Sequence, residues 1–318
     1  MTTSRQKQLR PRRIRLGYAL LGLAAVLALF PGVPGHAQEG ADRVIASPPS
    51  PTLHALVVAG INGDPQEIRD KAQAVQRLHR YFGTLDGVQA TFLVSPESPV
   101  AQLGRESTRA NLLAKLESLA NAVQPGDEVL FYFVGQANIV GEDLRLNLPG
   151  SDVRHRELVE ALAPLAVVPS VIVLDCPGAG MAVKPLTHPG RIVIAAARSD
   201  QPHSTRFSSY FVPALSSPEG DVDGDGHTSL LEAFQWSAQQ IDALYRDQGL
   251  MKNETPILED DADGEPSQSP WRFDATGKDG KKAAHWYFDG PGPGSTPPEA
   301  LKTAAPIQPG GAPHETNE

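Results

Sequence analysis

The 318-residue chain contains a single cysteine, Cys176, so no disulfide bond can form within it. The folded state must therefore be held together by a hydrophobic core, and a composition that is 40% hydrophobic is sufficient for one. Basic residues are also in deficit, because the formal net charge is −9. An acidic chain of this kind is not expected to bind nucleic acid. Repeats at the spacing of solenoids or propellers are absent from the sequence.

The first 37 residues are typical of a secretory signal peptide. Six basic residues precede an apolar run over 16–30, and Gly35-His36-Ala37 follows as a small-residue cleavage site. The apolar run is shorter than the ~20 residues that span a bilayer, so a retained membrane anchor is the less favoured alternative. We expect export to the periplasm or the extracellular space, with membrane contact only in transit. Removing the six basic residues takes the net charge from −9 to −15.

The remaining sequence predicts one folded domain with flanking tails. Residues 38–52 are a Pro- and Ser-containing linker, residues 53–286 form the domain, and residues 287–318 are a Pro- and Gly-rich tail expected to be disordered. Within the domain, short apolar runs alternate with amphipathic helical patterns. Strands are predicted at 53–60, 90–94, 127–134, 171–175 and 191–197, and helices at 65–82, after Thr108, and at 156–165, 207–215 and 229–248. This order predicts an α/β fold in which helices sandwich a mainly parallel sheet.

Chemistry is expected at the end of the most apolar predicted strand. Residues 171–175 lead directly into Cys176 and the turn Pro177-Gly178-Ala179-Gly180, and ligands of parallel sheets bind beyond the carboxyl ends of the strands. The backbone N–H groups of that turn can form an oxyanion-binding site or open a helix. Another apolar strand, 127–134, should bring Gln136 to the same edge.

These two strand ends resemble the caspase and legumain group of cysteine peptidases, and the resemblance extends from about Leu53 to Gly264. In that group a strand ending in Gly-His-Gly supplies the general base, and a later strand ends in the nucleophilic cysteine. The resemblance places Gln136 at the histidine position and Cys176 at the cysteine position. Glutamine does not titrate, so it can neither activate a thiol nor protonate a leaving amine. The resemblance therefore implies the family's fold with its catalytic pair broken.

A displaced base would have to be another histidine. His188 follows the Cys176 strand and His203 follows the last predicted strand, although both are also expected as solvated loop residues. With such a base, the chain would be an active cysteine endopeptidase that uses Cys176. Arg198, at the end of the last predicted strand, is a candidate contact for a carboxylate or polar group of a substrate, or else forms a surface salt bridge.

The sharpest motif is a calcium-loop pattern over 221–232, D-x-D-x-D-G-x5-E. A calcium ion takes six or seven oxygen ligands, and this spacing supplies them. The predicted ligands are the carboxylates of Asp221, Asp223 and Asp225, the backbone carbonyl of His227, the hydroxyl or a water at Ser229, and the bidentate carboxylate of Glu232. The residues before Asp221 do not form a helical pattern, so we expect a single EF-hand-like loop that binds structural Ca²⁺. Residues 260–264 carry a fragment of the same pattern and are interpreted as a surface turn.

The sequence thus favours an exported, calcium-stabilised domain of the caspase/legumain type that has lost its peptidase activity and binds peptide or protein. An active cysteine endopeptidase is the first alternative. A structural module of the cell envelope is the second.

Overall fold

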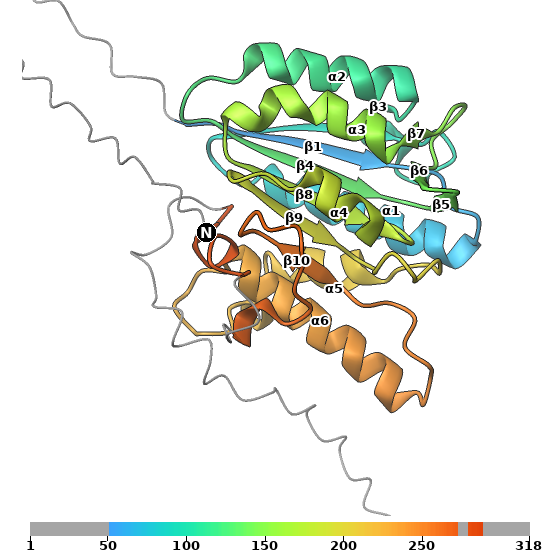
Figure 1. The fold of residues 1–318 in the computed structure, drawn as a ribbon, viewed down its shortest axis with the longest axis vertical. Helices are drawn as coiled ribbons and strands as arrows, with labels where there is room; N and C mark the ends of the chain where they lie inside the picture. The colour runs from blue at the N-terminus through green and yellow to red at the C-terminus, as the bar shows by residue number, and fades with distance from the viewer. Residues whose placement is uncertain (1–50, 273–278, 289–318) are drawn as a thin grey trace, which may run out of the picture. The chain divides into compact units, whose positions relative to one another are not determined.

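Seven strands form the central sheet, in the order β10-β9-β8-β4-β1-β2-β3 (Figure 1). The strands are β1 (Leu53–Ala59), β2 (Val88–Val94), β3 (Arg105–Glu106), β4 (Glu128–Val134), β8 (Ser170–Asp175), β9 (Arg191–Ala195) and β10 (Ile257–Glu259). Neighbouring strands are parallel, except that β10 runs antiparallel to β9. This computed structural model describes residues 51–272 and 279–288, so the predicted signal peptide and nearly all of the predicted linker and tail lie outside the described residues.

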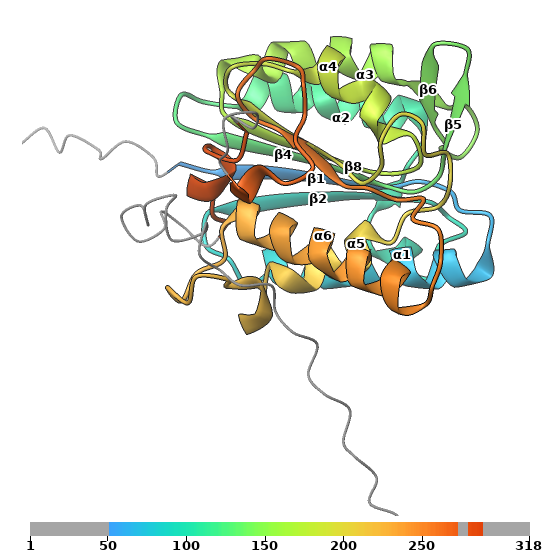
Figure 2. The same ribbon diagram turned by 60° about the horizontal axis from the view of Figure 1, so that its bottom comes forward.

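Helices cover both faces of the sheet, which confirms the predicted α/β architecture (Figure 2). One face carries α1 (Pro65–Phe82), α5 (Phe207–Ala214) and α6 (Leu230–Asp247), and the other carries α2 (Arg109–Ala122), α3 (His155–Leu162) and α4 (Val183–Leu186). Each face has its own apolar cluster, because successive side chains of a strand point to opposite sides. In β8, for example, Val173 belongs to the α1 side and Leu174 to the α2 side. None of the helices in the described ranges is long and apolar enough to cross a membrane.

Helix α1 shows how local sequence positions the later site. Asp64 caps it by accepting the backbone N–H groups of Gln66 and Glu67, and Pro65 occupies the first turn, where its missing N–H costs nothing. Its buried positions include four of the six residues predicted as its apolar stripe, Ala72, Val75, Leu78 and Phe82, whereas Ile68 is half-buried and His79 is exposed. The buried positions also include Lys71, which is only 5% exposed and was not expected among them.

A small antiparallel sheet stands beside the carboxyl edge of the main sheet. It consists of β5 (Ala137–Val140), β6 (Asp143–Leu146) and β7 (Val153–Arg154). Glycines bound the segment 141–150, and its apolar residues alternate with polar ones, a pattern that predicts a short strand or hairpin arm; β6 confirms this prediction. Because β5 starts one residue after Gln136, this hairpin sets the direction in which the chain leaves β4.

Candidate functional site

The carboxyl ends of β1, β4 and β8 converge on a tightly packed edge. A Cβ atom on Gly60 would lie 2.5 Å from the carbonyl oxygen of Asn147, and one on Gly135 would lie 3.0 Å from the Cα atom of Gly60. Gly60 therefore cannot carry a side chain without a shift of the backbone, and a side chain at Gly135 would be tightly packed. The backbone N–H of Gln136 donates to the carbonyl of Ile61 at 3.0 Å, which ties the chain leaving β4 to the chain leaving β1.

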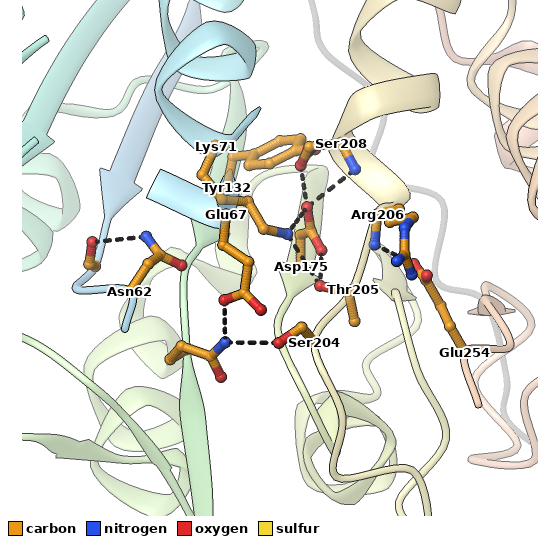
Figure 3. A network of polar contacts seen from close by, with 12 residues as sticks. Asn62, Glu67, Lys71, Tyr132, Asp175, Ser204, Thr205, Arg206, Ser208 and Glu254 are labelled. Atoms are coloured by element: carbon orange, nitrogen blue, oxygen red, sulfur yellow. Dashed lines mark hydrogen bonds and ion pairs between the residues drawn. The ribbon is translucent and has the colours of Figure 1, made fainter. Parts of the chain in front are cut away.

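The side chain of Gln136 is anchored on the α1 side of this edge. Its Nε2 donates to Glu67 Oε2 at 2.5 Å and to Ser204 Oγ at 2.9 Å (Figure 3). Glu67 lies in the first turn of α1, and Ser204 lies in the segment between β9 and α5. The amide thus acts as a hydrogen-bond donor that joins two segments, and it has no titratable nitrogen with which to accept a proton.

Cys176 lies on the opposite side of the sheet. It is 0% exposed and belongs to the apolar cluster that includes Leu112 and Leu116 of α2 and Leu158 of α3. Burial, reinforced by the negative charge of Asp175, raises the pKa of the thiol well above its usual value. No described imidazole forms a hydrogen bond with its sulfur. The thiol is therefore held in its protonated, unreactive form at neutral pH.

The residue before it, Asp175, is the centre of a buried polar network on the α1 side. Its carboxylate pairs with Lys71 Nζ at 2.9 Å and accepts hydrogen bonds from the hydroxyl of Thr205 and from both the N–H and the hydroxyl of Ser208 (Figure 3). Tyr132 from β4 shares a 2.8 Å hydrogen bond with the Ser208 hydroxyl. Burial raises the pKa of Asp175, but Lys71 and the two hydroxyl groups outweigh it and hold that pKa below its usual value. This network was not predicted from the sequence.

The turn after Cys176 opens a helix. The N–H of Gly178 donates to the carbonyl of Gln201 and the N–H of Gly180 donates to the carbonyl of Ala197, both at 2.9 Å. Gly178 has a φ of 65°, which favours glycine. The segment continues as a short 3₁₀ helix over Ala179–Ala182 and then as α4. Of the two roles expected for this turn, helix opening is the one observed, and these two amides are already used in the fold.

The two candidate bases differ in position. His188 precedes β9, and the carbonyl of Gly190 accepts the N–H of Ser170, the first residue of β8. Because Cys176 follows the other end of β8, His188 lies about 20 Å away along the strand direction. Of the two interpretations considered for His188, this position is that of a loop histidine, and it does not bring the imidazole to the thiol. His203 does lie at the carboxyl edge, next to Ser204, but it is exposed and the thiol is buried.

Arg198 pairs with a near neighbour in sequence. Its Nε and Nη2 donate to the two carboxylate oxygens of Asp200 at 3.0 and 2.7 Å, and both side chains are largely exposed. The hydrogen bond to Asp200 raises the pKa of Arg198 above its usual value. Of the two alternatives considered for Arg198, the surface salt bridge is the one observed.

The segment 221–232 folds as a loop that gathers carboxylates. One oxygen each from Asp221, Asp223 and Asp225 lie within 4.8 Å of one another. The carboxylate of Asp221 accepts the backbone N–H groups of Gly224, Asp225 and Gly226 at 2.8 to 3.1 Å. These hard oxygen donors suit calcium.

The last two predicted ligands of the loop also stabilise α6. Ser229 is the N-cap of this helix and exchanges hydrogen bonds with Glu232 in a capping box. Glu232 is 2% exposed and additionally accepts the N–H groups of Val222 and Asp223, both at 3.0 Å. Its burial raises its pKa. A 3₁₀ turn, Pro218–Gly220, precedes the loop in place of a helix, as the sequence predicted.

A second loop repeats this arrangement. Glu259, Asp261 and Asp263 each place a carboxylate oxygen within 4.8 Å of the others. Glu259 accepts the N–H groups of Ala262 and Gly264, which correspond in spacing to Gly224 and Gly226 of the first loop. All four residues at these positions have φ between 74° and 92°.

The counterpart of Glu232 comes from a distant part of the chain. Asp279 accepts the N–H groups of Asp260 and Ser267 at 2.8 and 2.9 Å, as Glu232 accepts those of Val222 and Ser229. Burial raises the pKa of Asp279 to about 7. The sequence predicted a surface turn over 260–264, and Asp279 does not lie at the spacing that the calcium-loop pattern requires. The sequence does contain a signal for this loop, because four residues occupy positions 1, 3, 5 and 6 of the calcium-loop pattern: Glu259, Asp261, Asp263 and Gly264.

Comparison with known proteins finds similarity only at the level of structure. No protein-family model matches the chain, and no curated protein matches its sequence. The Drosophila initiator caspase Dronc is 10% identical, with a TM-score of 0.38, over 67% of this chain and 81% of the caspase. Caspase-1 from Spodoptera frugiperda is 10% identical, with a TM-score of 0.42, over 67% and 87%. A secreted C11 cysteine protease from Bacteroides thetaiotaomicron is 9% identical, with a TM-score of 0.38, over 67% of each chain.

Proposed function

We propose that this chain is an exported domain of the caspase/legumain type that has lost its cysteine peptidase chemistry and acts by binding peptide or protein. The observation that carries the proposal is the separation of the two family positions. The Gln136 amide is bound to Glu67 and Ser204 on one side of the sheet, whereas the Cys176 thiol is buried among leucines on the other. A nucleophile and its base must lie within hydrogen-bonding reach, and glutamine is not a base.

The test is reaction with two peptidyl acyloxymethyl ketones, one with Asp and one with Arg next to the reactive group. We expect no labelling of the native protein. Iodoacetamide should modify Cys176 only after the protein is unfolded in urea, and the Cys176→Ala variant should remain unlabelled in both states. Labelling of the native wild type that disappears in Cys176→Ala would establish the alternative, an active endopeptidase in which the thiol becomes exposed and His203 serves as base.

Calcium binding by the loop 221–232 is the second part of the proposal. Asp221, Asp223 and Asp225 would hold the ion, together with the His227 carbonyl, Ser229 and Glu232. The bound ion would neutralise carboxylates that otherwise repel one another and would fix the start of α6, which packs on α5 in the apolar core. Its expected role is structural. Calorimetric titration of calcium into EDTA-treated protein measures it directly, and the absence of binding heat at millimolar calcium would refute it.

Export is the third part. It is supported by the basic residues, apolar run and Gly35-His36-Ala37 site of the leader. Expression of the full chain in a Gram-negative host should yield a periplasmic protein that begins at Gln38 by N-terminal sequencing. A cytoplasmic protein that retains residue 1 would contradict it.

A further inference from the structure

The two edge strands of the central sheet differ in whether their outer backbone groups are hydrogen-bonded. At the β10 edge, Leu258 exchanges two backbone hydrogen bonds with Ser267. A later part of the chain therefore pairs with the outer side of β10. At the other edge, β3 pairs only with Leu93 and Val94 of β2. Within the described residues, the amino-terminal part of β2, from Val88 to Phe92, has no strand on its outer side.

The register shows which backbone groups are exposed along this open edge. The N–H of Leu53 donates to the carbonyl of Gly87, and the N–H of Ser95 donates to the carbonyl of Ala59. In a parallel pair, every second residue of a strand directs both its N–H and its C=O toward the same neighbouring strand. These two bonds show that the odd-numbered residues of β2 turn their N–H and C=O groups toward β1. Val88 and Ala90 therefore turn theirs outward, where an added strand would pair with them, whereas Phe92 turns its carbonyl toward the β3 side.

A groove of about 520 Å³ runs along these outward-facing residues. The residues that line it include Val88, Ala90 and Phe92 from β2, Phe82 at the end of α1, and Leu103 and Arg105 on the β3 side. A Cβ atom on Gly104 would lie 2.1 Å from the carbonyl oxygen of Phe92, so glycine allows the chain to approach β2 closely where the groove ends. The groove thus combines unpaired backbone groups with apolar side chains.

The charge of the groove differs from that of the whole chain. No Asp or Glu lines it, although the chain carries a net charge of −9. Its charged residue is Arg105, which is exposed and forms no ion pair with any described residue. A ligand with a carboxylate at the Arg105 end would complement it.

We propose that this groove binds an extended segment of another protein as an additional strand beside β2. Such a segment would pair with the backbone of Val88 and Ala90, place alternate apolar side chains against Phe82 and Phe92, and present an acidic residue to Arg105. The inference rests on the proposed peptide-binding function and assigns that function to the sheet edge, away from Gln136 and Cys176. The rival occupant is the chain's own residues 289–318, because Phe288 contacts Tyr81 and Phe82 beside the groove.

The test begins with selection of phage-displayed random heptapeptides on the purified protein, followed by fluorescence anisotropy on synthetic copies. The expected peptides have apolar residues at alternate positions and at least one Asp or Glu. Ala90→Pro removes the outward N–H without touching the ladder to β1 and should raise Kd at least tenfold, as should Arg105→Glu. The controls are Gln89→Ala on the same strand and Arg69→Glu, an equal charge change on the exposed side of α1. Both should bind as the wild type does.

Hydrogen exchange provides a readout that does not depend on a folded proline variant. The amides of Val88 and Ala90 should exchange rapidly in the free protein and become protected by a selected peptide, while those of Gln89 and Thr91 stay protected throughout. Peptides that bind Ala90→Pro and Arg105→Glu normally would overturn the inference but preserve the peptide-binding function. If no peptide is enriched, both fail. Binding seen only after deletion of residues 289–318 would identify the tail as the occupant and overturn the assignment to another protein.

Discussion

The carboxylate of Asp175 and the thiol of Cys176 point to opposite faces of the central sheet, although the two residues are adjacent in the chain. Asp175 meets Lys71 at 2.9 Å on the α1 side, and Cys176 packs among apolar residues beneath α2 and α3. The polar group at the end of β8, the Asp175 carboxylate, thus forms a buried ion pair, and Cys176 is a residue of the apolar core. Gln136 is directed to the same side as Asp175, so a histidine introduced there would not reach the thiol.

Replacement of Gln136 by histidine tests this geometry. The new imidazole would face Glu67 and Ser204, so we expect iodoacetamide to label Cys176 in Gln136→His no faster than in the wild type. Gln136→Asn, which retains an amide, is the matched control. A tenfold or greater increase in the labelling rate of native Gln136→His, absent in Gln136→Asn, would mean that the two positions do meet in solution.

The buried ion pair should be sensitive to the loss of one partner. Lys71→Met leaves the fully buried Asp175 carboxylate without its counter-charge, and we expect a loss of about 3–5 kcal/mol in the free energy of unfolding. The double variant Lys71→Met with Asp175→Asn removes both charges and should be more stable than the sum of the two single changes predicts. Urea unfolding of the four proteins measures the coupling. Additive effects would show that the pair is not coupled.

Loss of a predicted calcium ligand should remove the response of the protein to chelator. At calcium concentrations a hundred times Kd, binding stabilises the folded state by about 2.7 kcal/mol, which corresponds to about 5–10 °C in Tm for a domain of this size. We expect EGTA to lower the Tm of the wild type by about 5–10 °C. The Tm of Asp223→Asn should fall much less. Glu117→Gln, an equal charge change on the exposed face of α2, should respond as the wild type does. An identical chelator response in Asp223→Asn would exclude this loop.

Much of the fold could be predicted because its elements are encoded locally. The cap at Asp64, Pro65 in the first turn and the apolar stripe that follows predicted α1 with the bounds observed. In contrast, β10 is three residues long and its partner, β9, lies about sixty residues earlier in the sequence. No local sequence pattern therefore predicts β10. The sequence predicted 191–197 as the last strand for this reason.

The site was harder to predict, since its contacts join distant segments. Lys71 and Asp175 are 104 residues apart, and a lysine within a helical pattern is usually expected to be solvated. Alternation along β8 does place Asp175 and Cys176 on opposite faces, but it does not say which face holds the polar partners. Asp279 completes the second acidic loop from outside the motif's spacing, and the sequence predicted a surface turn over 260–264.

The two acidic loops offer a reciprocal test of their shared geometry. Ala262 has a φ of 74° and is the only described residue other than glycine with a positive φ, whereas Gly224 occupies the corresponding position of the first loop. Ala262→Gly should stabilise the protein by about 1 kcal/mol by relieving backbone strain, and Gly224→Ala should destabilise it by a similar amount. A Cβ atom at 224 meets nothing within 4 Å, so a clash does not contribute. Denaturant unfolding of both variants measures the changes, and equal signs would contradict the correspondence.

Glu254 should make stability fall as pH rises. It is fully buried, its Oε1 accepts the N–H of Arg206 at 2.7 Å, and its Oε2 has no hydrogen-bond partner among the described residues. Burial, and then the negative charge of Asp175, raise its pKa from 4.5 to about 8. Between these values the folded protein holds a proton that the unfolded chain releases, so the contribution of Glu254 is fully present below pH 4.5 and is lost as pH rises toward 8.

Glu254→Gln mimics the protonated form and keeps the oxygen that accepts the Arg206 N–H. We therefore expect the variant and the wild type to have similar free energies of unfolding at pH 5, and the variant to become the more stable protein at pH 8. The wild type should lose up to about 1.4 kcal/mol per pH unit relative to the variant across this range. Urea unfolding at pH 5, 6.5 and 8 measures the difference. A constant offset between the two proteins would mean that Glu254 is ionised in the fold at neutral pH and that its burial is offset by Lys71 and Arg206.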